Sequence, residues 1–312
     1  MNLIPSENTQ LFGMSKFFNE IITLHKQKKM PTKILLSGKK GLGKSTLAYH
    51  VINYILSTNE KFEYDSRKFI INKDNRSFKL LQNKTHPNFY LVDLLSDKKN
   101  IDVIQIREMI TYTNKSTFNN MGRFILIDNI ENLNKNSVNA LLKIIEEPNE
   151  GVFFILINNS EKYILPTLKS RCLTFKISLT FVDSMLISNQ ILNENIFNLV
   201  NHDLINYYNT PGEVINLINF SRDKKINLKN YTLVSFLNLL IDNGYYKKNK
   251  FVKTLLINFI ELFFLKEYKL NTAKNSLLSL YYNFIRKIND TEKFNLDEES
   301  LFLEFKAKLL NE

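Results

Sequence analysis

Short apolar runs alternate with amphipathic patterns over the first half of the chain. Four runs are continuous apolar stretches, which is typical of strands buried on both faces of a sheet. They are Lys33–Leu36, Phe89–Val92, Phe124–Ile127 and Val152–Ile157, and Leu173–Ile177 is a possible fifth. A helical pattern follows each of the first three. This alternation predicts an α/β domain whose parallel sheet is covered by helices on both faces.

Helices are expected where apolar residues recur three and four positions apart. These stretches are Leu47–Ile55, Val103–Ile110 and Val138–Ile145. Pro148 stops the third, because proline has no N–H for the helical ladder. Residues 57–88, between the first stretch and the second strand, are polar and rich in Lys and Asn. They are expected to form an irregular insertion with at most short helices.

The alternation of strands and helices stops near residue 178. Residues 180–222 are predicted to form a small helical unit, and Ile226–Glu312 has a helical period. Within it, Phe251–Phe264 carries apolar residues four positions apart, and this broad stripe predicts the core of a helix bundle. The sequence therefore predicts three domains. They are an α/β domain at 1–178, a small helical domain at 179–225 and an all-α domain at 226–312.

Composition adds three constraints. No apolar run is long enough to cross a bilayer, and Met1–Glu7 lacks the layout of a signal peptide, so we expect a cytoplasmic protein with no membrane partner. The single cysteine, Cys172, excludes an internal disulfide, and with four histidines it argues against a zinc module. The net charge of +11 suits a polyanion such as nucleic acid, but it also fits a chain whose lysines are simply solvated.

A glycine-rich loop follows the first predicted strand. Residues Gly38–Ser45 fit the phosphate-loop pattern G-x-x-x-x-G-K-[ST] without exception. Its glycines let the backbone curl so that several N–H groups point at one phosphate chain. They are Gly38, Gly41 and Gly43. The helix that begins near Lys44 adds the positive end of its dipole, so the segment predicts a nucleotide site.

Four side chains are expected to hold ATP and Mg²⁺ there. Lys44 would reach the β- and γ-phosphates, the Ser45 hydroxyl would bind Mg²⁺, and Thr46 would lie beside the nucleotide. Asp128 ends the apolar run Phe124–Ile127 and matches the Walker B carboxylate, which holds the Mg²⁺ shell. The alternative for Asp128 is a carboxylate that only caps the next turn.

The residue after Asp128 argues against efficient hydrolysis. ATPases of this type place Glu there to polarise the attacking water, whereas this chain has Asn129. An amide cannot accept the proton of that water as a carboxylate can. Glu131 would need a different backbone path to reach the same water. We therefore expect nucleotide binding with poor hydrolysis.

Two further stretches resemble signatures of the AAA+ subunits of bacterial sliding-clamp loaders, which belong to the DNA polymerase III holoenzyme. Asn139–Pro148 resembles the helix after Walker B in that family, and Ser170-Arg171-Cys172 resembles the signature at its subunit interfaces. The resemblance covers about residues 8–220. It implies a P-loop AAA+ domain, a helical lid and a C-terminal helical collar for oligomerisation, in that order along the chain.

The resemblance also implies roles for single residues. In the family, the arginine of Ser-Arg-Cys is an arginine finger offered to the neighbouring subunit's ATP, and Arg171 matches it; a surface salt bridge is the alternative. Asn158 and Asn159 end the fourth strand where the family has its sensor-1 residue, which would bond the γ-phosphate or the attacking water. A plain strand-end turn is the alternative for these two. Lys143 would face either the DNA backbone or solvent.

Within the family, the chain resembles delta-prime subunits more than the gamma/tau motor subunits. Motor subunits resemble one another in a four-cysteine zinc module, a sensor-2 arginine and the catalytic Glu. Here residues 57–88 contain no cysteine, Gly212 stands at the sensor-2 turn, and Asn129 replaces the Glu. The implied partners are gamma/tau and delta subunits, the sliding clamp and primer–template DNA. The alternatives are an ATP-hydrolysing motor subunit, a stand-alone P-loop enzyme such as a nucleotide kinase, and a scaffold that binds no nucleotide.

Overall fold

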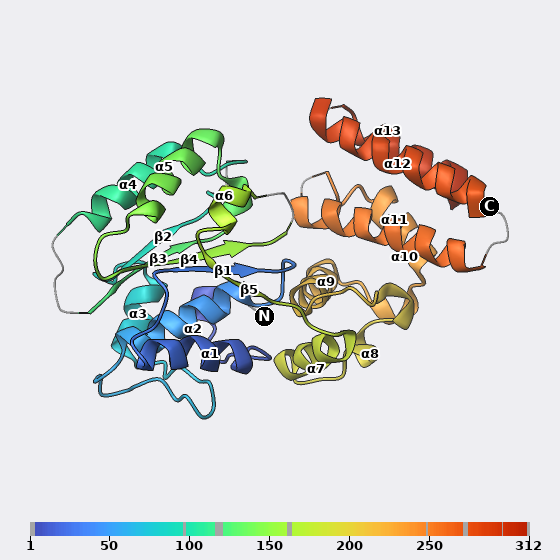
Figure 1. Ribbon diagram of the computed structural model, residues 1–312. Helices are drawn as coiled ribbons and strands as arrows, with labels where there is room; N and C mark the ends of the chain where they lie inside the picture. The colour runs from blue at the N-terminus through green and yellow to red at the C-terminus, as the bar shows by residue number, and fades with distance from the viewer. Residues whose placement is uncertain are drawn as a thin grey trace. The chain divides into compact units, whose positions relative to one another are not determined.

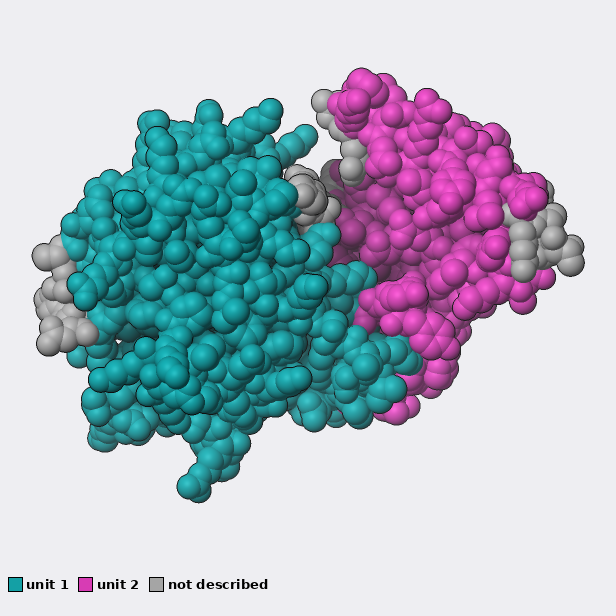
Figure 2. All heavy atoms as spheres, in the orientation of Figure 1, with its two compact units in different colours: residues 1–193, 210–215 teal, residues 194–209, 216–312 magenta. Residues whose placement is uncertain are grey.

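The computed structural model describes residues 4–95, 98–115, 121–160, 164–247, 249–270, 274–294 and 296–310. The first residues of the segment considered for a signal peptide, 1–3, lie outside these ranges. The chain divides into two compact units, which Figure 2 shows in separate colours. Unit 1 comprises residues 1–193 and 210–215, and unit 2 comprises residues 194–209 and 216–312. The first unit is α/β and the second is helical.

Within the described residues, unit 1 is built on a five-stranded parallel sheet with the order β2-β3-β4-β1-β5. The strands are β1 (Lys33–Ser37), β2 (Phe89–Val92), β3 (Arg123–Ile127), β4 (Val152–Asn158) and β5 (Leu173–Lys176). All five correspond to the predicted apolar runs, and the predicted parallel sheet is confirmed. Because every strand runs the same way, the residues that follow β1, β2, β3 and β4 meet at one edge of the sheet.

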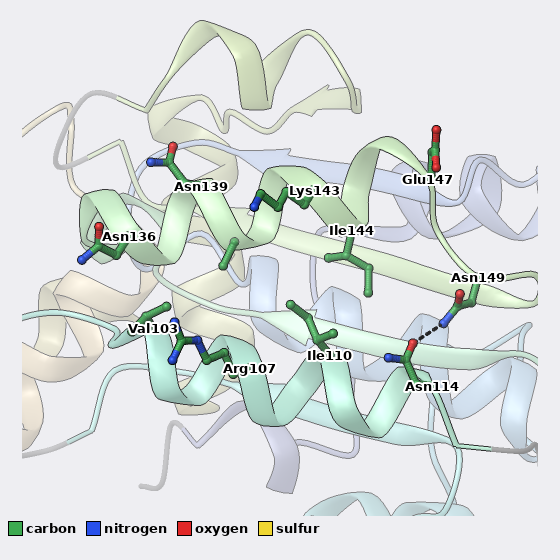
Figure 3. Close-up of a pocket in the computed structure, with 11 residues that line it drawn as sticks. Val103, Arg107, Ile110, Asn114, Asn136, Asn139, Lys143, Ile144, Glu147 and Asn149 are labelled. Carbon is green, nitrogen blue, oxygen red and sulfur yellow. Dashed lines mark hydrogen bonds between the residues drawn. The ribbon is translucent and has the colours of Figure 1, made fainter.

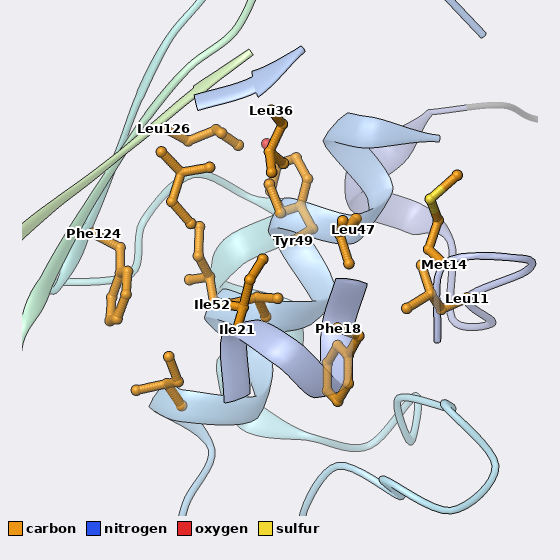
Figure 4. Packing of buried hydrophobic residues seen from close by; sticks show 14 of the residues in the cluster. Leu11, Met14, Phe18, Ile21, Leu36, Leu47, Tyr49, Ile52, Phe124 and Leu126 are labelled. Carbon is orange, nitrogen blue, oxygen red and sulfur yellow. The ribbon is translucent and has the colours of Figure 1, made fainter. Parts of the chain in front are cut away.

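Helices cover both faces of this sheet (Figure 1). On one face lie α1 (Ser15–Lys26), α2 (Lys44–Leu56) and α3 (Arg76–Gln82), and on the other lie α4 (Val103–Thr113) and α5 (Lys135–Glu146). Figure 4 shows the first of the two apolar cores, where Phe18, Leu47 and Ile52 pack beneath the strands. The second core joins α4 and α5 to the opposite face.

The segment 57–88 contains the short helix α3 and is otherwise irregular, as predicted, with turns and isolated antiparallel bridges at Ile70. The helix α1 is an addition to the sequence prediction. The rest of unit 1 contains α6 (Pro166–Lys169), α7 (Phe181–Leu192) and the first turn of α9 (Pro211–Lys224).

Unit 2 is a helical bundle with an aromatic core. Its helices besides the remainder of α9 are α8 (Ile196–Leu199), α10 (Leu233–Asp242), α11 (Lys250–Leu270), α12 (Lys274–Phe294) and α13 (Glu298–Leu309). The stripe predicted on α11 is buried, with Val252, Leu256 and Ile260 fully enclosed, so the expected bundle core is confirmed. Along the described residues, no helix combines the length and apolar character needed to cross a bilayer.

Candidate functional site

The phosphate loop connects β1 to α2 in the conformation that its glycines permit. Gly41 and Gly43 have φ angles of +83° and +89°, a region that side chains with a Cβ rarely adopt. Gly38 is packed so closely that a Cβ there would lie 2.2 Å from the carbonyl oxygen of Ile177. The helix α2 begins at Lys44, so the N–H groups of its first turn, which includes Thr46, lie next to the loop.

Lysine, serine and aspartate side chains converge at this loop. The Lys44 side chain is buried, and its ammonium donates a hydrogen bond to the Lys39 carbonyl at 2.7 Å. The Ser45 hydroxyl donates to Oδ2 of Asp128 at 2.5 Å. Burial raises the pKa of Asp128, and the neighbouring Asp93 carboxylate adds to the rise, although the Ser45 hydrogen bond opposes it. A hydroxyl and a carboxylate side by side are oxygen donors suited to Mg²⁺, so these residues fit a Mg²⁺–nucleotide.

Asn129 lies in a network of amides and a carboxylate at the ends of three strands. Its side-chain N–H donates to Oδ1 of Asp93 at 2.7 Å, and its oxygen accepts from the Asn159 amide at 2.8 Å. Its backbone is left-handed, with φ 56° and ψ 44°, which Asn tolerates better than most residues. Asn158, which precedes Asn159 in the chain, donates its side-chain N–H to the Ser37 hydroxyl instead, at 3.2 Å. The amide side chains therefore bond to one another, to Asp93 and to Ser37, and among these asparagines only the backbone N–H of Asn129 bonds to Asp128, at 2.7 Å.

Glu131 takes a structural position beneath this network. It is buried, and its Oε2 accepts the backbone N–H of Asn159 at 3.2 Å. The carboxylate thus ties the loop after β3 to the end of β4. This contact gives Glu131 a structural role, whereas the sequence offered it only as a distant substitute for the catalytic Glu.

The first turn of α9 packs directly on the phosphate loop. The Gly212 N–H donates to the Gly41 carbonyl at 3.0 Å, and the Thr210 hydroxyl donates to the Lys40 carbonyl at 2.9 Å. Glu213 pairs with Lys39 at 3.2 Å. A Cβ on Gly212 would lie 2.6 Å from the Gly41 Cα, so this approach is open only to glycine. The position that resembles the sensor-2 site is therefore filled by backbone.

Arg171 lies in the turn between α6 and β5. The turn is anchored by Leu168, which is buried, and by Cys172, which packs against the second core. Burial raises the pKa of the Cys172 thiol to about 11, so it is protonated at neutral pH, as expected of a packing residue. The Arg171 side chain points outward with 36% exposure and pairs with Glu146 at 2.6 Å. It is thus on the surface, but in an ion pair.

A groove of about 610 Å³ runs between α4 and α5 (Figure 3). Arg107 from α4 and Lys143 from α5 line it together with four amide side chains. The amides are Asn114, Asn136, Asn139 and Asn149. Asn149 donates to Asn114 at 2.9 Å and closes one end. Glu147 and apolar side chains also line the groove, so its two cations exceed its one carboxylate, and with the amides they give it donors that suit phosphate oxygens.

The family described as DNA polymerase III, delta subunit, matches residues 13–180, which is just over half of the chain. The chain belongs to this family.

Individual relatives agree with the family match. The delta-prime subunit of DNA polymerase III from Buchnera aphidicola (subsp. Schizaphis graminum) is 30% identical over 187 residues, which cover 59% of this chain and 55% of that protein. The gamma subunit from Buchnera aphidicola (subsp. Acyrthosiphon pisum) is 26% identical over 294 residues, covering 86% and 74%. The chain spans about half the length of the delta-prime relatives it matches. The resemblance to DNA polymerase III clamp-loader subunits is therefore confirmed, with delta-prime as its type.

The fold also recurs among solved structures. A DNA polymerase III gamma subunit-related protein from Thermotoga maritima superposes with a TM-score of 0.53 at 16% identity, covering 92% of this chain and 97% of that one. At this identity the likeness concerns the fold alone, and it agrees with the predicted α/β architecture that has a parallel sheet and a helical C-terminal region.

Several site residues of this delta-subunit family member were not anticipated. Asp93 follows β2 as Asp128 follows β3, and this repeated strand-end carboxylate was the available signal. Thr210 and Glu213 form a reciprocal cap at the start of α9, which the T-x-x-E spacing encodes. Glu146 has no such signal, because its contact with Arg171 joins positions 25 residues apart.

Restoring the family's carboxylate by Asn129→Glu is expected to destabilise the protein by about 2 kcal/mol and to leave hydrolysis poor. Glu would lose the hydrogen bond to Asp93, add a third carboxylate beside Asp93 and Asp128, and adopt a left-handed backbone that costs about 1–2 kcal/mol. Urea unfolding and steady-state phosphate release measure the two effects.

Two controls separate the causes. Asn129→Asp tolerates the left-handed backbone but adds the charge, whereas Asn129→Gln stays neutral but does not favour that backbone. If Asn129→Glu is as stable as the parent and hydrolyses ATP, then the amide network around Asn129 determines neither the stability of this site nor its poor hydrolysis.

Proposed function

We propose that this chain is a delta-prime-type subunit of the DNA polymerase III clamp loader, which helps to place the sliding clamp on primed DNA. In this proposal it binds ATP and Mg²⁺ through the phosphate loop, hydrolyses ATP poorly, and donates Arg171 to the ATP of a neighbouring subunit. Its partners are gamma/tau and delta subunits, the clamp, and primer–template DNA within the assembled complex, and its location is the cytoplasm.

The observation that carries the proposal is the placement of Arg171. The turn that holds it is fixed by the buried Leu168, while the guanidinium itself reaches the surface. A planar cation on a rigid turn can stabilise the charge that spreads over the γ-phosphate oxygens of an ATP bound elsewhere. The phosphate loop of this chain follows β1, whereas Arg171 precedes β5, which runs parallel to β1, so the two lie at opposite edges of the sheet and the finger serves another subunit's ATP.

Poor hydrolysis is supported by the surroundings of Asp128. Asn129 already donates to one carboxylate and accepts from Asn159, so it offers no base for a water. Glu131 is held by the Asn159 backbone. The chain's own nucleotide would accordingly serve binding and assembly, with Lys44 and the N–H groups around it on the phosphates and Ser45 and Asp128 beside the metal.

The remaining segments take roles in the same assembly. Residues 179–225 act as the lid of the AAA+ domain, and residues 226–312 act as the collar that joins the subunits. The α4–α5 groove, with Arg107 and Lys143, faces the phosphate backbone of DNA, and its contribution falls as salt rises.

An ATP-hydrolysing gamma/tau-type motor is the second candidate. It is favoured by the intact phosphate loop and by the similarity to Buchnera gamma subunits, one of which aligns over 86% of this chain. The motor reading requires another group to replace the missing carboxylate at Asn129.

One experiment separates the two candidates. The purified chain is mixed with motor-type and clamp-opening subunits from the same source, and the complexes are resolved by size-exclusion chromatography with multi-angle scattering. A delta-prime-type subunit is expected to enter a complex that already contains motor subunits, while showing no DNA-stimulated ATP turnover alone. Failure to join such a complex, or strong turnover by the isolated chain, would overturn the proposal.

A further inference from the structure

The guanidinium of Arg171 is engaged within its own chain by both terminal nitrogens. Nη2 donates to Oε1 of Glu146 at 2.6 Å, and Nη1 donates to the Thr167 carbonyl at 2.8 Å. These are the donors with which an arginine grips a phosphate bidentately. Each terminal nitrogen has a second N–H, but both ends of the guanidinium are already held by acceptors of its own chain, so a triphosphate must compete with Glu146 and Thr167 for its position.

The contact is local to the side chains, because the backbone on both sides is fixed. Glu146 is the last residue of α5, and the carbonyl of Ile145 next to it accepts from the Lys33 ammonium at 3.0 Å. Leu168 anchors the turn that carries Arg171. Moving the guanidinium from Glu146 to an external anion therefore needs only rotation of one long side chain.

The surroundings of Arg171 are electronegative. Glu146 stands at the C-terminal end of α5, where the helix dipole is negative and favours a cation. The Thr167 carbonyl, in α6, adds a second acceptor. The side chains of Arg171 and Glu146 are 36% and 49% exposed, so water and salt weaken this ion pair and keep it reversible.

We propose that Glu146 is a positioning residue that holds Arg171 on its own α5 until a neighbouring subunit's triphosphate competes for the guanidinium. The inference rests on the proposed role of Arg171 as a finger in trans. The carboxylate and the γ-phosphate are rival anions for one guanidinium, so loss of the carboxylate favours engagement of the neighbour's ATP. For a pair this exposed, the competition is worth about two- to fivefold in apparent affinity.

The first measurement addresses the contact in the isolated full-length chain. Glu146→Gln keeps the size of the side chain but removes its charge. Guanidinium NMR is expected to show slow rotation of the Arg171 terminal nitrogens in the parent and faster rotation in Glu146→Gln. Glu150→Gln removes the same charge four residues away in the loop before β4 and is the matched control, for which the parent signal is expected.

The second measurement uses the reconstituted complex. Glu146→Gln is expected to lower KM for ATP about two- to fivefold with little change in kcat, and Arg171→Ala with Glu146→Gln is expected to behave as Arg171→Ala alone. If Glu146→Gln leaves both KM and guanidinium rotation unchanged, or raises KM, then Glu146 does not restrain Arg171. If Arg171→Ala leaves turnover at the parent level, both the finger role of Arg171 and its restraint by Glu146 are wrong. If Arg171→Ala lowers turnover but Glu146→Gln has no effect, only the restraint by Glu146 is wrong.

Discussion

Arg171→Ala is expected to lower ATP hydrolysis at the subunit interface it serves by about 10³-fold, because arginine fingers contribute roughly 10³–10⁵ in rate. The guanidinium offsets charge on the γ-phosphoryl group in the transition state, where no water-mediated contact replaces it equally well. The measurement is single-turnover hydrolysis, with clamp and primed DNA, in complexes whose other motor subunits carry inactive phosphate loops. That design isolates the one site that this chain completes.

Two control variants test whether the effect depends only on positive charge at this surface. Lys169→Ala removes an exposed cation from the same turn and is expected to change the rate little. Arg171→Lys keeps the charge but loses the planar fork, so an intermediate rate is expected. Turnover of Arg171→Ala within about twofold of the parent would remove the arginine finger from the proposed function.

The sheet was predictable from sequence because its strands are buried on both faces. In β3 and most of β4 every side chain is enclosed by helices, so the strands stand out as continuous apolar runs. The helix α1 was missed although its Phe18 and Ile21 are buried, because no strand before it marked the start of a repeating unit. The phosphate loop was predictable because the demand for glycine at φ near +85° leaves a signature in the chain itself.

Contacts between distant segments left no comparable signature. The turn at Thr210–Glu213 reaches the phosphate loop across about 170 residues, and the only trace of that approach is that position 212 is glycine. The amide network around Asn129 draws Asp93 and Asn159 from two other strands, and their pairing depends on strand order, which the apolar runs do not encode. Sequence thus located the candidate nucleotide site with Asn129 and Asn159, but not Asp93, nor the contacts that join these residues.

Gly41→Ala is expected to destabilise the phosphate loop by about 2–5 kcal/mol. A left-handed backbone costs alanine about 1–2 kcal/mol, and overpacking adds about 1–3 kcal/mol. The overpacking arises because a Cβ at this position would lie 2.4 Å from the Thr210 hydroxyl oxygen and 3.2 Å from the Gly212 Cα. Urea unfolding measures the total loss, and hydrogen exchange at the Gly212 amide reports whether the turn has left the loop.

Gly43→Ala separates the two causes. Gly43 has a similar φ of +89°, but a Cβ there would meet nothing within 4 Å, so this variant carries the backbone cost alone. The difference between the unfolding free energies of the two variants therefore measures the steric cost of packing the α9 turn against the phosphate loop. The amide of Gly212 is expected to exchange faster only in Gly41→Ala. Equal stabilities and equal exchange would mean that the turn does not rest on the loop in solution, and that position 212 is free to carry a side chain.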